Sequence, residues 1–433
     1  MNEEITSAGL DKIFRKVTLH LIPLIFICYL FNYLDRTNVG FAKLQMLDAL
    51  KMSSSAYGFG AGIFFIGYVI CGVPSNLIMR RVGARRWMGI LMIVWGLLSA
   101  SLMFIRTPNQ FYVLRFLTGV AEAGFFPGMV IYLSQWYPSV WRGRAIGLFM
   151  SAIPLSGVLG SPLSGWMLQY FSHGQGGIGG WQWLYLLQGM PTAILGALLF
   201  VLLPDRVEDV HWLSNDEKTA ARNALTEDEA SKPVTAAPRP SLGQVLTNPS
   251  VWKFGVVYFT LQMGVYAINF WMPTLIKSLG FNSTVTIGWL SAIPYLAATV
   301  LMIAVGKSAD ARRERRYHLS GPMLVSMVGF VLASLTSHPG IAMVGLTLAA
   351  AGAVTGLAMF WPLPTAVLSG ITAAAGVAFI NSLGQIAGFV SPYIAGWIQD
   401  TMHNATITLY LLSGAMVIGI ALVLHTKASQ VNR

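Results

Sequence analysis

Long apolar stretches dominate this sequence and restrict its fold more than any other feature. Hydrophobic residues make up 55% of the 433 residues and charged residues only 10%, whereas about 25% of an average soluble protein is charged. A helix crosses a hydrocarbon layer of about 30 Å with roughly 20 apolar residues. Twelve stretches are of this order, and each is continuously apolar rather than alternating, which favours helices over barrel strands. The predicted spans are 17–39, 57–79, 87–106, 110–135, 145–170, 182–203, 251–276, 284–305, 319–336, 340–362, 372–397 and 405–425. The sequence therefore predicts an all-α membrane protein with twelve transmembrane helices.

The basic residues are distributed unevenly between the two sides of the predicted membrane. With the N-terminus inside, the inside loops hold the clusters 80–86 and 307–316, and the outside segments keep only Lys43, Lys51, Arg106 and Lys277. Cytoplasmic loops are enriched in Lys and Arg, so both termini are expected in the cytoplasm, with the protein in the cell (inner) membrane. The net charge of +11 then reflects orientation and contact with anionic lipids, and binding to nucleic acid is not expected.

A polar segment divides the spans into two groups of six. It contains charges, three prolines between Lys232 and Pro240, and the sequence Ser214-Asn-Asp-Glu217, which fits a helix capping box. The predicted organisation is a cytoplasmic N-terminal segment 1–16, a six-helix bundle 17–203, a cytoplasmic linker 204–250, a second bundle 251–425 and a cytoplasmic tail 426–433.

The two groups of six also contain an internal repeat. Ser161-Pro-Leu-Ser-Gly-Trp166 in the fifth span is echoed by Ser391-Pro-Tyr-Ile-Ala-Gly-Trp397 in the eleventh, and the basic loop 80–86 by 307–316, both at an offset near 230 residues. Parallel halves related by an axis along the membrane normal are typical of transporters that rock around a site at the midplane. The repeat predicts this pseudo-two-fold arrangement.

Four charged residues lie inside the spans of the first half. They are Asp35 and Arg36 in the first span and Arg115 and Glu122 in the fourth. Charge at the bilayer centre costs roughly 2.5–3.5 kcal/mol on insertion scales, so such residues are functional candidates. Arg115 and Glu122 are seven residues apart and share a helix face, whereas Asp35 and Arg36 point about 100° apart.

These four residues allow two interpretations. Arginine presents a planar fork of donors that matches a carboxylate, which suits Arg36 and Arg115 to holding an organic anion. Asp35 and Glu122 are then candidate proton carriers, with Glu122 favoured by its apolar neighbours. The alternative is that Asp35 with Arg115, or Arg36 with Glu122, forms a buried ion pair that only sets helix register.

The second half offers neutral polar groups instead of charges. Tyr266 and Asn269 in the seventh span share a face, as do Asn381 and Gln385 in the eleventh, and Trp361 lies in the tenth. Each is a candidate for contact with substrate, or for a hydrogen bond between helices.

Several segments resemble those of a known family. Tyr33-Leu-Asp-Arg-Thr-Asn38, the segment from Arg115 to Pro127, Trp136-Tyr-Pro138 and Arg142-Gly-Arg144 resemble the major facilitator superfamily, and within it the anion:cation symporter family. The resemblance covers essentially the whole chain and is greatest to bacterial tartrate, sugar-acid and aromatic-acid permeases. It implies the major facilitator fold and proton-driven uptake of organic anions by alternating access. Asp35 and Glu122 would carry protons, and Arg36 and Arg115 would bind or sense the anion.

The resemblance also implies further site and gating residues. In D-galactonate-type members two tyrosines, a tryptophan and an asparagine line the substrate site, and the matching positions are Tyr33, Tyr68, Trp361 and Asn381. The gating loops correspond to Arg81, Gly83 and Arg85 in the first half and to Asp310 and Arg312 in the second. One departure stands out, because Arg80 occupies the position where the superfamily loop usually has an acidic residue, whereas the second copy keeps Asp310.

The expected function is a proton-coupled symporter that imports a small organic anion such as tartrate or a sugar acid. The alternative is an exchanger or uniporter without proton coupling. No set of nucleophile, base or metal ligands is found within the spans, so an enzyme is not expected, and the short linker and tails disfavour a signalling receptor. The proton is the only coupling partner expected, with no other cofactor, and the protein is expected to be a monomer.

Overall fold

The structure is built from helices that cross a membrane. The computed structural model describes residues 7–231, 242–368 and 372–431, and no strand occurs within these ranges. Twelve helical segments of the described chain are long and apolar enough to span a bilayer, which confirms the predicted number. The first span extends well past its predicted end at residue 39, and α1 continues as helix to Leu50.

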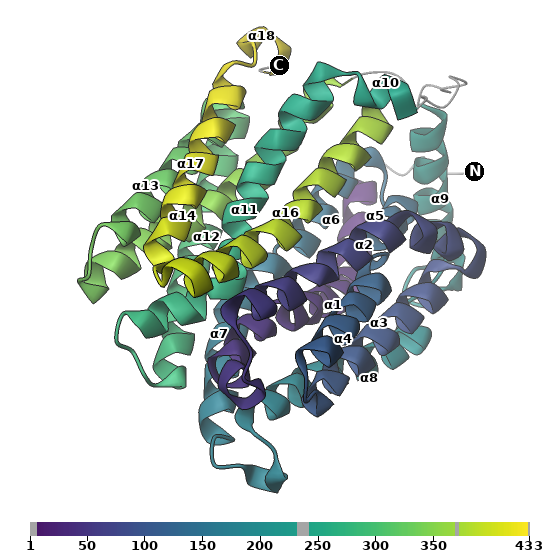
Figure 1. Ribbon diagram of the computed structural model, residues 1–433. Helices are drawn as coiled ribbons and strands as arrows, with labels where there is room; N and C mark the ends of the chain where they lie inside the picture. The colour runs from purple at the N-terminus through teal and green to yellow at the C-terminus, as the bar shows by residue number, and fades with distance from the viewer. Residues whose placement is uncertain (1–6, 232–241, 369–371, 432–433) are drawn as a thin grey trace.

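The helices are numbered in chain order in Figure 1. The first half comprises α1 (Ser7–Leu50), α2 (Ser54–Val82), α3 (Ala84–Ser101), η1 (Leu102–Phe104), α4 (Pro108–Glu122), α5 (Phe125–Trp136), α6 (Ser139–Met150), α7 (Ala152–Tyr170), η2 (Gln175–Gly177) and α8 (Gly180–Leu202). The linker contains η3 (Val207–Asp209), α9 (Asn215–Ala230) and α10 (Leu242–Leu246). The second half comprises α11 (Pro249–Ser278), α12 (Thr284–Arg312), α13 (Arg316–Ser334), α14 (Pro339–Phe360), α15 (Pro362–Val367), α16 (Thr372–Met402), α17 (Ala405–Leu424) and α18 (Ala428–Val431). Among the described residues, three spans each consist of two consecutive α-helices, namely α4 with α5, α6 with α7, and α14 with α15, and the third span continues from α3 into η1.

The linker helix α9 is fixed at both its start and its side. Ser214 and Glu217 form the predicted capping box, in which the Ser214 hydroxyl accepts from the Glu217 amide at 3.2 Å and the Glu217 carboxylate accepts from the Ser214 amide at 2.7 Å. Such a box satisfies backbone donors that would otherwise lack partners. Lys16 of α1 forms an ion pair with Glu217 at 2.9 Å, so α9 is tied to the cytoplasmic end expected for α1.

The two halves lie side by side and pack with pseudo-two-fold symmetry. In Figure 1 the first half is purple to blue and the second is green to yellow. The principal contacts between halves are made by α7 with α12, by α2 with α16, and by α1 with α11. The fifth span thus packs on the eighth and the eleventh on the second, which are the pairs that a two-fold axis interchanges. The repeated motifs beginning at Ser161 and Ser391 lie in α7 and α16, so the internal repeat occupies this interface.

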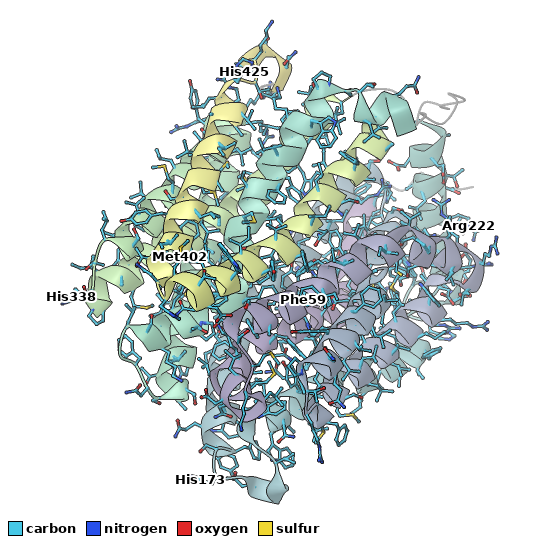
Figure 2. All side chains as sticks on the ribbon, viewed as in Figure 1. Phe59, His173, Arg222, His338, Met402 and His425 are labelled. Carbon is cyan, nitrogen blue, oxygen red and sulfur yellow. The ribbon has the colours of Figure 1, made fainter. Side chains whose placement is uncertain are left out.

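The halves are in close contact at the end of the molecule away from the linker. A Cβ atom added to Gly288 would lie 2.6 Å from the carbonyl oxygen of Ser161, a separation that only glycine permits. Phe59 of α2 packs on Phe389 of α16, with ring centroids 5.7 Å apart. Figure 2 shows Phe59 at the boundary between the two halves. We call this region, where α1, α2 and α7 meet α11, α12 and α16, the closed end.

One prediction about charge is wrong at this end. Lys43 was expected in an outside segment beyond the first span, but it lies within α1 and only 4% of it is exposed. The reason is tertiary packing, since this part of α1 is covered by α11 and α2.

Candidate functional site

A buried ion pair joins the first and fourth spans. The Nε atom of Arg36 on α1 donates to Oε1 of Glu122 at the end of α4, and the two side chains are only 8% and 1% exposed. The helix breaks immediately after Glu122, before α5 begins at Phe125. Oε2 of Glu122 has no hydrogen-bond partner among the described residues. The pair therefore neutralises two charges while one carboxylate oxygen remains without a donor.

Aromatic rings surround the Arg36 guanidinium. Its central carbon lies 5.2 Å from the ring centroid of Tyr33, 5.1 Å from that of Tyr68 and 5.5 Å from that of Phe64. Cations are attracted to aromatic faces at such distances, more strongly where water is excluded. The structure thus brings the predicted residues Tyr33, Tyr68 and Arg36 together. Phe64 was not predicted, because an apolar ring in an apolar span carries no distinguishing signal.

Arg115 lies close to this group on the other side of Phe64. Its guanidinium carbon is 4.7 Å from the Phe64 ring, and Nη2 donates to the carbonyl oxygen of Ala61 at 3.5 Å. The residue is 1% exposed, and its Nε has no partner among the described residues. Phe64 therefore contacts both guanidinium groups. Of the two ion pairs considered from sequence, Arg36 with Glu122 is present, and no Asp35 to Arg115 pair occurs in the described part of the chain.

Asp35 forms hydrogen bonds with a separate set of residues within the first half. Its Oδ1 accepts a hydrogen bond from Ser99 of α3 at 3.1 Å, and its Oδ2 accepts from Thr192 of α8 at 2.9 Å. Only 2% of Asp35 is exposed. The expected divergence of Asp35 and Arg36 around α1 explains this separation. Ser99 and Thr192 were not predicted, since hydroxyl residues are common within transmembrane helices.

In the second half, Tyr266 and Asn269 both contact neighbouring helices. The Tyr266 hydroxyl donates to Oε1 of Gln385 on α16 at 2.8 Å, and Oδ1 of Asn269 accepts from the Tyr295 hydroxyl on α12 at 2.7 Å. The ring of Tyr266 also lies 4.4 Å from that of Phe65 on α2. Tyr266 is therefore a point where the second half touches the helix that carries Phe64 and Tyr68.

Trp361 and Asn381 lie on the second half as well. Trp361 joins α14 to α15 and packs against Tyr258, with ring centroids 4.9 Å apart. Asn381 is half-buried on α16, one helical turn before Gln385. Within the described ranges neither residue forms a hydrogen bond or ring contact with Arg36 or Glu122, so their role as substrate ligands stays a prediction.

In the first half, where Arg80 occupies the usual acidic position, the gating loop contacts an aspartate from another part of the chain. Gly83 has a positive φ of 92° and ends α2, a conformation that favours glycine. Nε of Arg85 lies 3.2 Å from Oδ2 of Asp205, which follows α8, and Asp205 also accepts from the Arg85 amide. Asp205 was not predicted, because it is distant in sequence from the loop that it contacts.

The second loop contains an ion pair of its own. Asp310 lies 2.8 Å from Arg315. Arg81 and Arg312 are exposed at the ends of α2 and α12. Each loop thus forms an ion pair within its own half, the first with a residue distant in sequence and the second with a near neighbour.

Twelve spans in two symmetric halves, with paired and unpaired charges buried between the helices, define a polytopic membrane transporter rather than an enzyme. The chain belongs to the Major Facilitator Superfamily, whose family model matches residues 25–392.

Similar proteins agree with this assignment. The chain is 43% identical over 98% of its length to a Pseudomonas putida protein provisionally named as the metabolite transport protein NicT, of which it covers 97%. It is 40% identical over 97% of its length to an Agrobacterium vitis protein provisionally named as a tartrate transporter, of which it covers 96%. Among solved structures, a bacterial homologue of the human lysosomal transporter Spinster superposes with a TM-score of 0.73, covering 95% of this chain and 96% of the other. At 14% identity this last likeness shows the fold alone. The predicted superfamily is confirmed.

Proposed function

We propose that this protein is a proton-coupled symporter that imports a small organic anion, such as tartrate or a sugar acid, across the cell inner membrane. The observation that carries the proposal is the buried pair of Arg36 and Glu122, in which a carboxylate already occupies the donor best suited to an organic anion. The provisional name of the Agrobacterium vitis relative supports tartrate as a first substrate to test.

The pair provides a competition between two carboxylates for one arginine. When Glu122 is ionised, it satisfies Arg36 by charge and hydrogen bond. Protonation of Glu122 would leave the Arg36 charge uncompensated in a site with little water, and a buried unpaired charge is costly. A substrate carboxylate would then take the place of Glu122, so binding of the anion and binding of the proton would favour each other.

Arg115 provides a second positive group beside the same ring. Its Nε has no partner in the described chain, so it keeps a donor for the anion or for Glu122. Tyr33 and Tyr68 supply hydroxyls next to Arg36. Tyr266 and Asn269 present neutral polar groups from the other half, which suits a substrate with hydroxyls. Movement of one half relative to the other would carry the loaded site between the two sides.

Orientation follows from the basic residues. The clusters 80–86 and 307–316 lie at the same end as the linker, and this end is cytoplasmic in the proposal. The closed end therefore faces outward, and the halves must separate there for the anion to enter.

The test is the variant Glu122→Gln in proteoliposomes. It mimics the protonated carboxyl, so we expect accumulation of tartrate driven by an imposed pH gradient to be lost while exchange of tartrate across the bilayer continues. A thermal-shift panel of organic acids checks binding independently, because a ligand of the native state raises apparent stability. Undiminished pH-driven uptake by Glu122→Gln would remove Glu122 from the mechanism, and uptake by the unaltered protein that ignores the gradient would favour an exchanger or uniporter.

A further inference from the structure

Lys43 is a buried basic residue that the mechanism above does not use. It lies on α1 with 4% of its surface exposed, and its Nζ has no hydrogen-bond partner among the described residues. Its ammonium lies 3.1 Å from the ring centroid of Trp271 on α11 and 4.9 Å from that of Tyr57 on α2. A lysine amine that contacts aromatic faces and no carboxylate is an unusual arrangement within a membrane protein, and its charged form is costly there.

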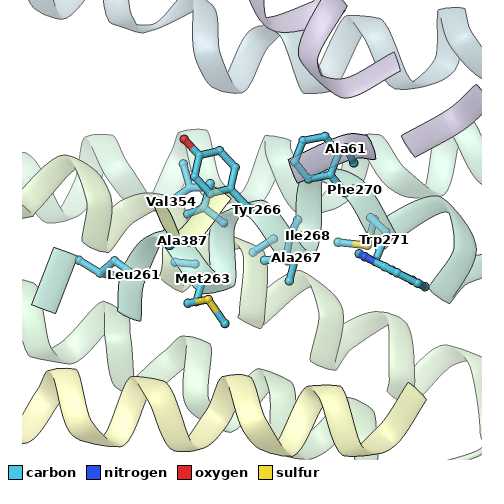
Figure 3. Close-up of a cluster of buried hydrophobic side chains, with 14 of the residues drawn as sticks. Ala61, Leu261, Met263, Tyr266, Ala267, Ile268, Phe270, Trp271, Val354 and Ala387 are labelled. Atoms are coloured by element: carbon cyan, nitrogen blue, oxygen red, sulfur yellow. The ribbon is translucent and has the colours of Figure 1, made fainter. Parts of the chain in front are cut away.

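Trp271 has an indole N–H donor beside Lys43 that is also without a partner in the described part of the chain. The indole Nε1 has no acceptor within the described ranges, although Trp271 is only 5% exposed. Figure 3 shows Trp271 at one end of a cluster of buried side chains, most of the labelled ones on α11. Two buried donors from opposite halves therefore meet without an acceptor.

Lys43 lies on the same face of α1 as Arg36. The two residues are seven apart on α1, so they lie within about 20° of the same helix face, with Lys43 about 10 Å nearer the closed end. Two basic side chains thus share one face of α1, Lys43 toward the closed end and Arg36 in the central pair.

The contact between Lys43 and Trp271 depends on closure of the two halves. The Tyr57 hydroxyl donates to the carbonyl oxygens of Val39 on α1 and Phe270 on α11, at 3.3 and 3.2 Å. A Cβ atom added to Gly40 would lie 2.8 Å from the carbonyl oxygen of Asn269. When the halves part at this end, Trp271 must leave Lys43, because the two residues belong to different halves.

We propose that Lys43 forms a second, outer binding site for carboxylate anions, which lines the outward-facing route and is covered by Trp271 when the closed end seals. The inference rests on the proposed function for its orientation and substrate class. An anion arriving from outside would meet Lys43 first and then Arg36. Closure would replace the anion at Lys43 with the aromatic face of Trp271, which favours release of the anion inward.

The first experiment tests accessibility and requires no knowledge of the substrate. Lys43→Cys is introduced with Cys28→Ala and Cys71→Ala, and intact cells are treated with a negatively charged, membrane-impermeant thiol reagent. We expect modification from the outer face. Absence of outer-face modification in a protein that reaches the membrane would overturn the inference, whichever anion is transported and whether or not protons are coupled.

The second experiment tests anion binding from each side, with tartrate as the probe. Lys43→Met is expected to raise the KM for exchange about tenfold at the outer face, the effect of losing one charge-assisted hydrogen bond. In inverted vesicles, where the anion enters from the inner face, KM for Lys43→Met should stay within about twofold of the value for the unaltered protein. Lys43 is covered by Trp271 when the site opens to that side. Lys43→Arg should restore the outer value in large part. The matched control is Lys277→Met, which removes an exposed cation at the same end of the molecule.

The outcomes separate this inference from the proposed function. Equal KM changes at both faces, or no change at the outer face, would show that Lys43 only supports packing, and would overturn the outer site. Tartrate uptake by the unaltered protein that does not depend on the pH gradient would instead contradict proton coupling. The exchange measurements on Lys43→Met would still be valid.

Discussion

The carboxylate of Asp400 caps the start of α2 from the opposite half. Near the end of α16, it accepts hydrogen bonds from the backbone amides of Ser54 at 3.0 Å and Ser55 at 2.7 Å, and from the Ser55 hydroxyl. The first amides of a helix lack partners within the helix, and the helix dipole favours a negative charge there. Ser53 provides the local cap, since its hydroxyl accepts from the Ala56 amide at 3.1 Å. Asp400 adds a second cap across the boundary between the halves, and so joins them at the closed end.

Weakening this cap should open the closed end. A capping interaction is worth about 1 kcal/mol, so Asp400→Ala should change the ratio of closed to open forms by roughly fivefold. Spin labels at the exposed positions Lys51 and Lys277, one on each half, would report a larger population of long distances. Asp48→Ala is the control, since Asp48 is exposed at the same end. An unchanged distance distribution would show that Asp400 does not hold the halves together.

Replacing Arg36 by lysine should distinguish what its charge and its planar geometry each contribute to anion binding. Arg36→Lys keeps the positive charge and loses the planar fork, so we expect KM for the anion to rise by about tenfold or more. Arg144→Lys, at an exposed position on α6, is the control. A normal KM in Arg36→Lys would mean that Arg36 provides charge only.

The hydroxyl partners of Asp35 should set the pH at which it takes up a proton. Thr192→Val removes one of the two donors to the carboxylate while keeping the shape of the side chain. Loss of a donor disfavours the ionised form, so half-maximal uptake should move to higher pH. Measured pH profiles for Thr192→Val and Ser99→Ala should shift in the same direction. If Asp35 is only structural, both variants will lose stability and keep the original profile.

The docking of α9 should depend on pH through Glu217. The hydrogen bond from the Ser214 backbone amide, with a further contribution from Lys16, holds the pKa of Glu217 below its ordinary value of 4.5. A carboxyl group with a lowered pKa in the folded state stabilises that state above its unfolded pKa, and this contribution disappears as the pH falls through the folded pKa. Proteolysis of the linker in detergent should therefore accelerate below about pH 4.5.

A matched pair of variants isolates the part played by Glu217. Glu217→Gln should make linker cleavage faster at pH 7 and less dependent on acid, whereas Glu229→Gln, exposed near the end of the same helix, should behave like the unaltered protein. Equal cleavage of both variants at pH 7 would contradict the role of the capping box and the Lys16 pair.

The number of membrane spans could be predicted from the sequence because it depends on local composition. Lipid cannot satisfy backbone polar groups, so a long apolar stretch must become a helix, and twelve such stretches specified the spans. The capping box at Ser214 was equally predictable, since all its partners lie within four residues. The repeat at Ser161 and Ser391 indicated the symmetry, which is a relation within the sequence itself.

The candidate site could be predicted only as a set of residues. Charge inside a span is exceptional, and this singled out Asp35, Arg36, Arg115 and Glu122. Their pairing could not be predicted, because either arginine had an acidic residue available. The structure pairs Arg36 with Glu122 and places Asp35 with Ser99 and Thr192.

The sequence by itself determined that this chain spans a membrane twelve times and carries buried charge in its first half. Only the tertiary structure decided that Lys43 is buried beneath Trp271 and that Asp400 caps α2. The physical reason is that both relations join residues more than 200 positions apart, across two halves whose relative placement depends on packing at Gly40, Gly288 and their neighbours. No local pattern of hydropathy or charge encodes such a contact.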